Sequence, residues 1–175
     1  MARRDTEWVR FDWRLKGQVF EFSVADGYGL RRANEIDLDV MRAIVGTAYA
    51  SDPQWDGKIE DIERRVMSRV CARIADPTAY FLLAIGGDRV VGLNGVALAS
   101  ETNMNLITGI CVEPSHQGRG LATALLGGSL AWLRDNGLSE ATVTTAANAV
   151  AANVYARFGA VATLGVPFAD SPKAQ

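Results

Sequence analysis

The chain has 175 residues, of which 49% are hydrophobic and 22% charged, and its formal net charge is −2. Such a length and composition are typical of one globular domain with a substantial core. The small net charge gives no broad basic surface, which argues against nucleic acid as a partner. No apolar run approaches the roughly 20 residues that a membrane-spanning helix needs, so we expect no membrane partner.

Cysteine and histidine are scarce in this sequence. Cys71 and Cys111 are far apart and each lies in an apolar pattern, which favours a reduced, cytoplasmic setting over a disulfide framework. The first ten residues, MARRDTEWVR, lack the apolar core of an export signal. With His116 as the only histidine, we expect no metal site.

Residues 7–24 alternate between apolar and polar side chains. The apolar positions begin at Val9, and the same period of two resumes at Phe20 after the turn residues Lys16-Gly17. This pattern predicts a two-stranded β-hairpin, which we place in an N-terminal extension over residues 1–26. An isolated hairpin is marginal in water, so it should pack on the main body or pair two subunits of a homodimer.

We expect the main domain over residues 27–166 and a flexible tail over 167–175. The elements predicted in it, in order, are a strand over 28–33, a helix ended by Ser51-Asp52-Pro53, a helix ended by Asp76-Pro77, strands over 80–85, 90–99 and 106–112, a helix over 121–134, a strand over 141–145, a helix over 149–158 and a strand over 160–166. Antiparallel strands come first and a parallel crossover follows, which predicts an α+β or mixed α/β fold.

The stretch QGRG, residues 117–120, stands between a predicted strand and a predicted helix. A helix begins with about four backbone N–H groups that have no partner inside it, and its dipole is positive at that end. Gly118 and Gly120 remove Cβ atoms there, Ala122 keeps the first turn slim, and Arg119 adds a charge at the rim. The turn therefore suits a phosphate or pyrophosphate, with an ordinary strand-to-helix turn as the alternative.

Two segments together indicate a family. Val112-Glu113-Pro114 ends a strand and Gln117-Gly118-Arg119-Gly120-Leu121-Ala122 opens a helix, while Asn148, Tyr155 and Gly159 follow at spacings of seven and four. In this order they resemble the GNAT superfamily of acetyl-CoA-dependent N-acetyltransferases, over roughly residues 28–166. The resemblance implies a mixed, mostly antiparallel sheet, splayed between the strands before and after the glycine-loop helix, with helices on both faces.

The resemblance also implies how acetyl-CoA binds. Backbone N–H groups of residues 117–122 would bind the pyrophosphate, and pantetheine would lie between the strands over 106–112 and 141–145, bonded to Ile110 and Val112. The cofactor-binding residues implied in this way are Ile110, Cys111, Val112, Gln117, Gly118, Arg119, Gly120, Leu121, Ala122, Asn148, Asn153 and Tyr155. For Asn148 a helix N-cap, and for Tyr155 simple core packing, are the alternatives.

Transfer of acetyl to an amine needs a group that takes the amine's proton and an acid for the leaving thiolate. The resemblance makes Tyr155 the general acid, since a phenol and a thiol have similar pKa values. The strand LITGICV carries no carboxylate, so Glu101 or Asn105, just upstream, would act as base directly or through water. Glu113 and His116 lie at the phosphate end, and we interpret both as surface residues.

The connection between the first two helices would wall the acceptor pocket. Asp52, Trp55 and Asp56 there could bind a cationic amine, although an ordinary polar loop is the alternative. The sequence therefore predicts an N-acetyltransferase acting on a small amine or a peptide N-terminus. A CoA-binding sensor without turnover is the main alternative, favoured by the missing strand carboxylate, and a glycine loop for another nucleotide is a weaker one.

Overall fold

We describe the protein from a computed structural model, which describes residues 6–148 and 151–167. The strands and longer helices of these residues are β1 (Trp8–Arg14), β2 (Tyr28–Arg32), α1 (Leu38–Ala50), α2 (Ile59–Arg73), β3 (Ala79–Gly86), β4 (Arg89–Ala97), β5 (Cys111–Val112), α3 (Leu121–Asp135), β6 (Glu140–Ala146) and β7 (Val161–Leu164). Short 3-10 helices span Glu35–Asp37, Pro53–Trp55 and Pro114–His116, and a π-helical turn spans Ala151–Tyr155.

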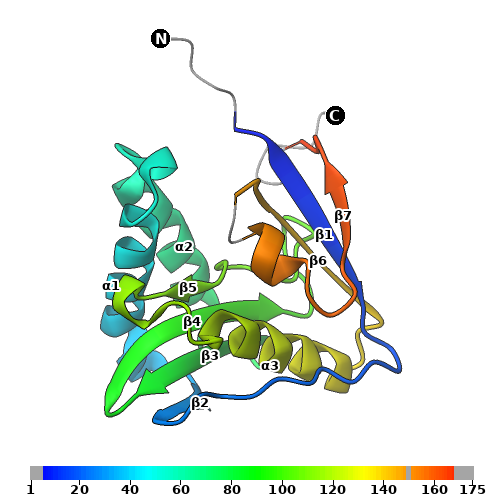
Figure 1. Ribbon diagram of the computed structural model, residues 1–175, viewed down its shortest axis with the longest axis horizontal. Coiled ribbons are helices and arrows are strands. Elements are labelled where there is room, and N and C mark those ends of the chain that lie inside the picture. The colour runs from blue at the N-terminus through cyan, green and yellow to red at the C-terminus, as the bar shows by residue number, and fades with distance from the viewer. Residues whose placement is uncertain (1–5, 149–150, 168–175) are drawn as a thin grey trace.

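Two antiparallel sheets form the framework (Figure 1). β2, β3, β4 and β5 pair in that order, and β1 lies between β6 and β7 in the second sheet. α1 and α2 pack on one face of the four-stranded sheet and α3 on the other. This arrangement confirms the predicted α+β architecture with helices on both faces.

The four-stranded sheet is covered on both faces because the side chains on both faces of its central strands are mostly apolar. Neighbouring side chains of a strand point to opposite faces. Leu82 accordingly packs with Leu121 of α3, whereas Leu83 packs with Met41 of α1 and Val66 of α2. Burial of each such side chain contributes about 1.5–3 kcal/mol, so these two cores hold the sheet between its helices.

The prediction of an N-terminal hairpin is wrong. β1 pairs with two strands from the far end of the chain, so that Phe11 lies opposite Val143 of β6 and Ala162 of β7. Residues 15–27 form no strand and run along α3 instead, where the absence of a side chain at Gly127 makes room for the Phe22 ring. Alternation predicts a strand correctly, but it carries no information on which strand is the partner. Of the predicted extension and tail, residues 1–5 and 168–175 lie outside the described residues.

The strand predicted over 106–112 is interrupted. Only Cys111–Val112 form β5, and Leu106 makes an isolated bridge to Val96. Between them Gly109 adopts a φ of +73°, and the Thr108 hydroxyl accepts the Gly95 N–H at 2.7 Å. This hydrogen bond to a side chain takes the place of a backbone hydrogen bond between the two strands, so the backbone can bulge at Gly109.

The last predicted elements are shorter than expected. The strand predicted over 160–166 is β7, four residues long. Of the helix predicted over 149–158, residues 149 and 150 lie outside the described residues, and of the rest only Ala151–Tyr155 are helical, as a π-helical turn. π-helical turns are rare in proteins, and those that occur often lie at functional sites.

Candidate active site

A cleft of about 1140 Å³ opens between the edge strands β5 and β6. At its closed end the chain before β5 is tied to β6, since the Asn105 N–H donates to the Thr142 carbonyl at 2.9 Å and the Thr142 N–H donates to Asn105 Oδ1 at 3.1 Å. From Ile107 to Val112 the chain turns toward β4 and lines the cleft on one side, opposite Val143 to Ala146. The predicted splay of the two strands is confirmed.

One end of the cleft is formed by the glycine turn. Gly118 and Gly120 have φ of +73° and +77°, and a Cβ at either would meet no heavy atom within 4 Å. Gly120 is the N-cap of α3 and no side chain caps this helix, so the first-turn N–H groups are directed at the cleft, which Leu121, Ala122 and Thr123 line. Uncapped donors in an open cradle fit a diphosphate well.

The side chains of Gln117 and Arg119, which belong to the glycine turn, are placed differently. Gln117 lines the cleft and its amide donates to the Val112 carbonyl at 3.1 Å, which ties the turn to β5. The side chain of Arg119 is not among the residues that line the cleft. Its guanidinium lies over the Tyr28 ring, 5.9 Å from the centroid, so it belongs to the outer surface of the turn.

Tyr155 closes the cleft at its centre. Its hydroxyl accepts the Ile110 N–H at 3.0 Å, and its side chain is only 4% exposed. The rings of Phe11 and Trp13 on β1 hold the phenol, with centroids 5.8 and 6.2 Å from its own. Burial raises the pKa of Tyr155 well above its ordinary value, although the bond from Ile110 opposes the rise. The phenol therefore keeps its proton at neutral pH.

The cofactor residues predicted around Tyr155 line the same cleft. Asn148 and Asn153 lie on its wall, as do Ile110, Cys111 and Val112 on the opposite side. The Glu113 N–H donates to Val91 of β4, so by the alternation of a strand the N–H groups of Ile110 and Val112 point away from β4 and into the cleft. Burial raises the pKa of the Cys111 thiol to about 12, which excludes a thiolate nucleophile there.

A second hydroxyl, which the sequence analysis did not identify, lies beside Tyr155. A Cβ built on Gly109 would lie 3.3 Å from the Tyr49 hydroxyl and 3.8 Å from that of Tyr155. Burial also raises the pKa of Tyr49. The spacing of Tyr49 fits the apolar stripe of α1, and the available signal for another role was its place in the last turn of this helix, next to the predicted acceptor loop.

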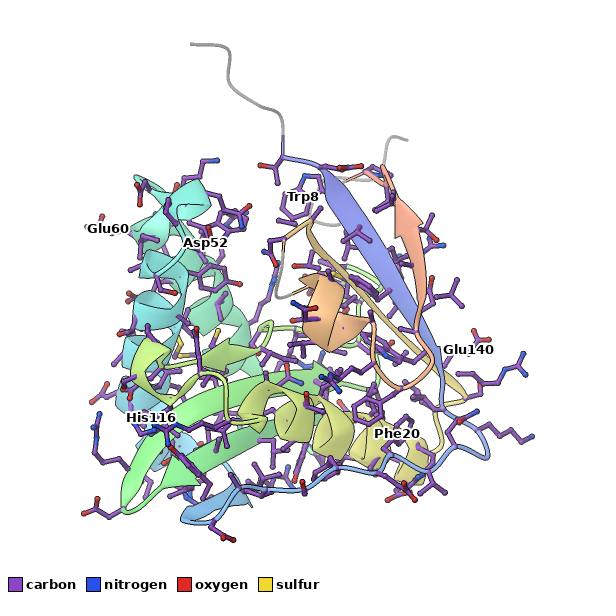
Figure 2. The ribbon with its side chains drawn as sticks, viewed as in Figure 1. Trp8, Phe20, Asp52, Glu60, His116 and Glu140 are labelled. Carbon is purple, nitrogen blue, oxygen red and sulfur yellow. The ribbon has the colours of Figure 1, made fainter. Side chains whose placement is uncertain are left out.

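The predicted acceptor residues divide between the cleft and the surface. Asp52 and Trp55 line the cleft, whereas Asp56 is exposed and outside its lining. The carboxylate of Asp52 caps the Pro53–Trp55 turn by accepting the Gln54 N–H at 3.1 Å. In Figure 2, Asp52 and Trp8 lie on opposite sides of the upper opening, and His116 lies far below them.

None of the predicted bases meets Tyr155. Glu101 lies on an exposed turn outside the cleft lining. Asn105 is occupied in joining the two sheets, since its amide also donates to the Ala97 carbonyl at 3.1 Å. His116 is bonded to the Tyr28 hydroxyl at 2.8 Å, at the glycine-turn end of the cleft. Within the described residues, no three His, Cys, Asp or Glu side chains are grouped to hold a metal, and no helix is long and apolar enough to cross a membrane.

The sequence model of the acetyltransferase (GNAT) family matches residues 41–160 of this chain, which include the glycine turn and Tyr155. The chain belongs to the GNAT family. β1, which holds the Tyr155 ring, lies outside the residues that the GNAT model matches. No curated protein matches the sequence.

Solved structures share the GNAT fold at low identity. A GCN5-related N-acetyltransferase from Sphaerobacter thermophilus is 21% identical, with a TM-score of 0.68 over 92% of this chain and 50% of its own. One from Ralstonia eutropha is 18% identical, with a TM-score of 0.62 over 85% and 99%. A functionally unknown conserved protein from Staphylococcus epidermidis is 14% identical, with a TM-score of 0.59 over 91% and 58%. The chain thus spans half the length of the first and little more than half the length of the third.

Proposed function

We propose that the protein transfers an acetyl group from acetyl-CoA to a primary amine of a small molecule or of a peptide N-terminus. Membership of the GNAT family supports acyl transfer from a CoA thioester. The observation that carries the proposal is the contact between the Tyr155 hydroxyl and the Ile110 N–H, because it places a protonated phenol on the cleft-facing edge of β5.

Different groups of the chain bind different parts of acetyl-CoA along the cleft. Acetyl-CoA, when bound, supplies the acetyl group activated as a thioester. The N–H groups of the glycine turn and of the first turn of α3 bind its diphosphate, and the inward N–H of Val112 holds the arm between the sheets. These contacts set the thioester beside Tyr155.

Proton transfer falls to Tyr155 and water. The amine nitrogen forms the new bond to the acetyl carbon as the carbon–sulfur bond breaks. Tyr155 gives its phenolic proton to the departing sulfur, and its oxygen is stabilised by the Ile110 N–H that it already accepts. With no predicted base beside Tyr155, the amine binds in its neutral form, and the proton that its nitrogen loses on acetylation passes to water, from which Tyr155 is reprotonated.

The Tyr155→Phe variant tests this role. The ring contacts with Phe11 and Trp13 persist, so we expect a fold and a CoA affinity close to wild type. Turnover should fall by about 10² or more, the usual contribution of a positioned acid. Tyr80→Phe is the matched control, since Tyr80 stacks on Trp132 and does not line the cleft. Undiminished turnover in Tyr155→Phe would contradict the assignment.

A CoA sensor without turnover is the second candidate. The observation in its favour is that, of the described residues lining the cleft, Asp52 alone carries a carboxylate, and this carboxylate caps its own loop. The two candidates differ in one measurement, the release of free thiol from acetyl-CoA over a broad panel of amines. CoA binding with no thiol release from any amine would favour the sensor.

A further inference from the structure

The Tyr49 hydroxyl is a polar group of the cleft that the proposed transfer leaves without a role. Tyr49 lies in the last turn of α1, and its ring meets that of Trp55 edge-on, with the two centroids 5.8 Å apart. The side chain packs on the core that α1 and α2 form with the sheet, and it lines the cleft. Among the described residues, none forms a hydrogen bond with its hydroxyl. A donor without a partner at the wall of a cleft is available to a bound substrate.

The hydroxyls of Tyr49 and Tyr155 face one small space in front of Gly109. A Cβ built on Gly109 would lie 3.3 Å from the Tyr49 oxygen and 3.8 Å from the Tyr155 oxygen. Outside residues 108–110, no other heavy atom of the described residues comes within 4 Å of that point. Because glycine has no Cβ, the space is open to a group as small as an acetyl, which would contact both hydroxyls.

Two other polar groups beside Gly109 already have partners. The Ile110 N–H donates to the Tyr155 oxygen at 3.0 Å. The Thr108 hydroxyl accepts the Gly95 N–H and donates to the Gly109 carbonyl, both at 2.7 Å. Neither group can donate to a substrate without losing its present partner. The Tyr49 hydroxyl can donate at no such cost.

Attack on a thioester needs two donors around one carbon, because the carbonyl oxygen and the sulfur are bonded to the same atom. One donor gives its proton to the sulfur, and the other keeps its proton while it stabilises the charge on the oxygen. The Ile110 N–H stabilises the Tyr155 phenolate and so opposes the rise in pKa that burial causes, which suits the proton donor. Burial also raises the pKa of Tyr49, although Arg69 and Arg65, which line the cleft too, act in the opposite direction. Among the described residues no N–H donates to the Tyr49 oxygen, which suits the hydroxyl that keeps its proton.

We propose that Tyr49 is a second catalytic residue, whose hydroxyl donates a hydrogen bond to the carbonyl oxygen of the bound thioester while Tyr155 protonates the sulfur. The inference rests on the proposed acetyl transfer and names the group that stabilises the charged oxygen. As the amine nitrogen bonds to the acetyl carbon, an electron pair of the carbonyl moves onto its oxygen, which accepts the bond from Tyr49. As the carbon–sulfur bond breaks, that pair restores the carbonyl, and the Tyr155 proton goes to the sulfur.

The Tyr49→Phe variant removes the hydroxyl and keeps the ring. Its contact with Trp55 persists and no hydrogen bond to a described residue is lost, so we expect the stability and the affinity for free CoA, which has no acetyl carbonyl, to stay near wild type. The kcat for thiol release should fall by about 10²–10³, as it does when one donor to an oxyanion is removed. Tyr80→Phe is the matched control, because Tyr80 lies outside the cleft lining. An undiminished kcat in Tyr49→Phe would overturn the proposal.

Infrared spectroscopy distinguishes the hydrogen bond from a packing role of Tyr49. The probe is acetyl-CoA labelled with ¹³C at its carbonyl and bound without amine, because a carbonyl that accepts a hydrogen bond absorbs at lower frequency. We expect a lowered frequency in wild type and in Tyr80→Phe, and a return toward that of the unbonded thioester in Tyr49→Phe. The same lowered frequency in Tyr49→Phe would assign the oxygen to a backbone N–H and would overturn the proposal.

The two measurements separate this inference from the proposed function. Thiol release from no amine at all would overturn the proposed function, and the catalytic role of Tyr49 with it. Thiol release in wild type, with a kcat and a carbonyl frequency that Tyr49→Phe leaves unchanged, would overturn this inference alone.

Discussion

The indole N–H of Trp13 donates a 2.9 Å hydrogen bond to the carbonyl of Arg157, across 144 residues of sequence. Arg157 follows Tyr155 by two residues, and the Trp13 ring itself lies 6.2 Å from the Tyr155 ring. Strand β1 thus holds the proposed acid from two sides. The alternating pattern of this segment predicted an appended hairpin, whereas in the structure its strand β1 is the wall against which Tyr155 is positioned.

Replacing this indole should therefore affect stability and turnover together. Trp13 is fully buried, so Trp13→Ala should lower the free energy of unfolding by about 3–5 kcal/mol. Trp13→Phe keeps an aromatic ring but loses the bond to Arg157, and we expect a cost of about 1–3 kcal/mol with a lower kcat. Urea unfolding and thiol release at saturating acetyl-CoA measure the two effects.

Trp132→Phe provides the comparison for Trp13→Phe. Trp132 stacks on Tyr80 at 5.0 Å and does not line the cleft, so its replacement should leave kcat near wild type whatever its cost in stability. A kcat that falls equally in both variants would show that the loss in Trp13→Phe reflects general loosening of the fold.

The parts of this site that the sequence predicted are local. The glycine turn follows from the spacing of Gly118 and Gly120 before a helix, and both adopt the positive φ that such a turn requires. Tyr155 followed from a motif within one short segment. Neither prediction depended on which strands pair.

The parts that were missed depend on long-range contacts or on ordinary residue types. The partners of β1 lie at the other end of the chain, so no periodicity within residues 7–24 could identify them. Arg65 and Arg69 belong to a residue type that is common on the solvated face of an amphipathic helix, and only the placement of α2 beside the cleft distinguishes them from Arg64. The bulge at Gly109 did have a signal in the sequence, because a glycine inside a strand pattern weakens the strand and often marks a bulge.

The bulge can be tested by adding one methyl group. Gly109→Ala places a Cβ 3.3 Å from the Tyr49 hydroxyl on a backbone with φ of +73°, where an L-residue costs about 1–2 kcal/mol. We expect a loss of stability of that size and a larger loss of turnover, because the Ile110 N–H moves with the bulge. Urea unfolding and steady-state kinetics measure both.

Gly29→Ala is the matched substitution for Gly109→Ala. Gly29 lies in β2, its φ is not positive, and an added Cβ meets no heavy atom within 4 Å. Its cost should stay within about 0.5 kcal/mol, as for most surface changes. Equal stability and equal turnover in the two alanine variants would rule out a special backbone at Gly109.

The ion pair before α1 should make stability depend on pH. Asp37 is 4% exposed and accepts two bonds from Arg31, at 2.7 and 2.9 Å, which hold the pKa of its carboxyl below its usual range. This stabilisation is complete above the unfolded pKa of about 4 and is lost as pH falls through the lower folded pKa. Asp37→Asn should therefore cost about 1–3 kcal/mol near neutral pH and progressively less below about pH 4.

Urea unfolding of wild type and Asp37→Asn at several pH values measures this difference. Asp61→Asn serves as the control, because its pair with Arg64 is exposed and should contribute at most about 0.5 kcal/mol at any pH. A cost of Asp37→Asn that stays constant down to about pH 3 would mean that the lost contribution is packing and not charge.

A negative charge in the first turn of α3 should have opposite effects on the stability of the helix and on the affinity for CoA. Thr123 lies in the first turn of α3 and lines the cleft. In Thr123→Glu the carboxylate meets the positive end of the helix dipole, so stability should rise by about 0.3–1 kcal/mol. The same charge repels the diphosphate, and we expect CoA to bind at least about tenfold more weakly by calorimetry. Thr123→Gln, of the same size but neutral, should bind CoA nearly as wild type does. Equal affinity in the two variants would place the diphosphate elsewhere.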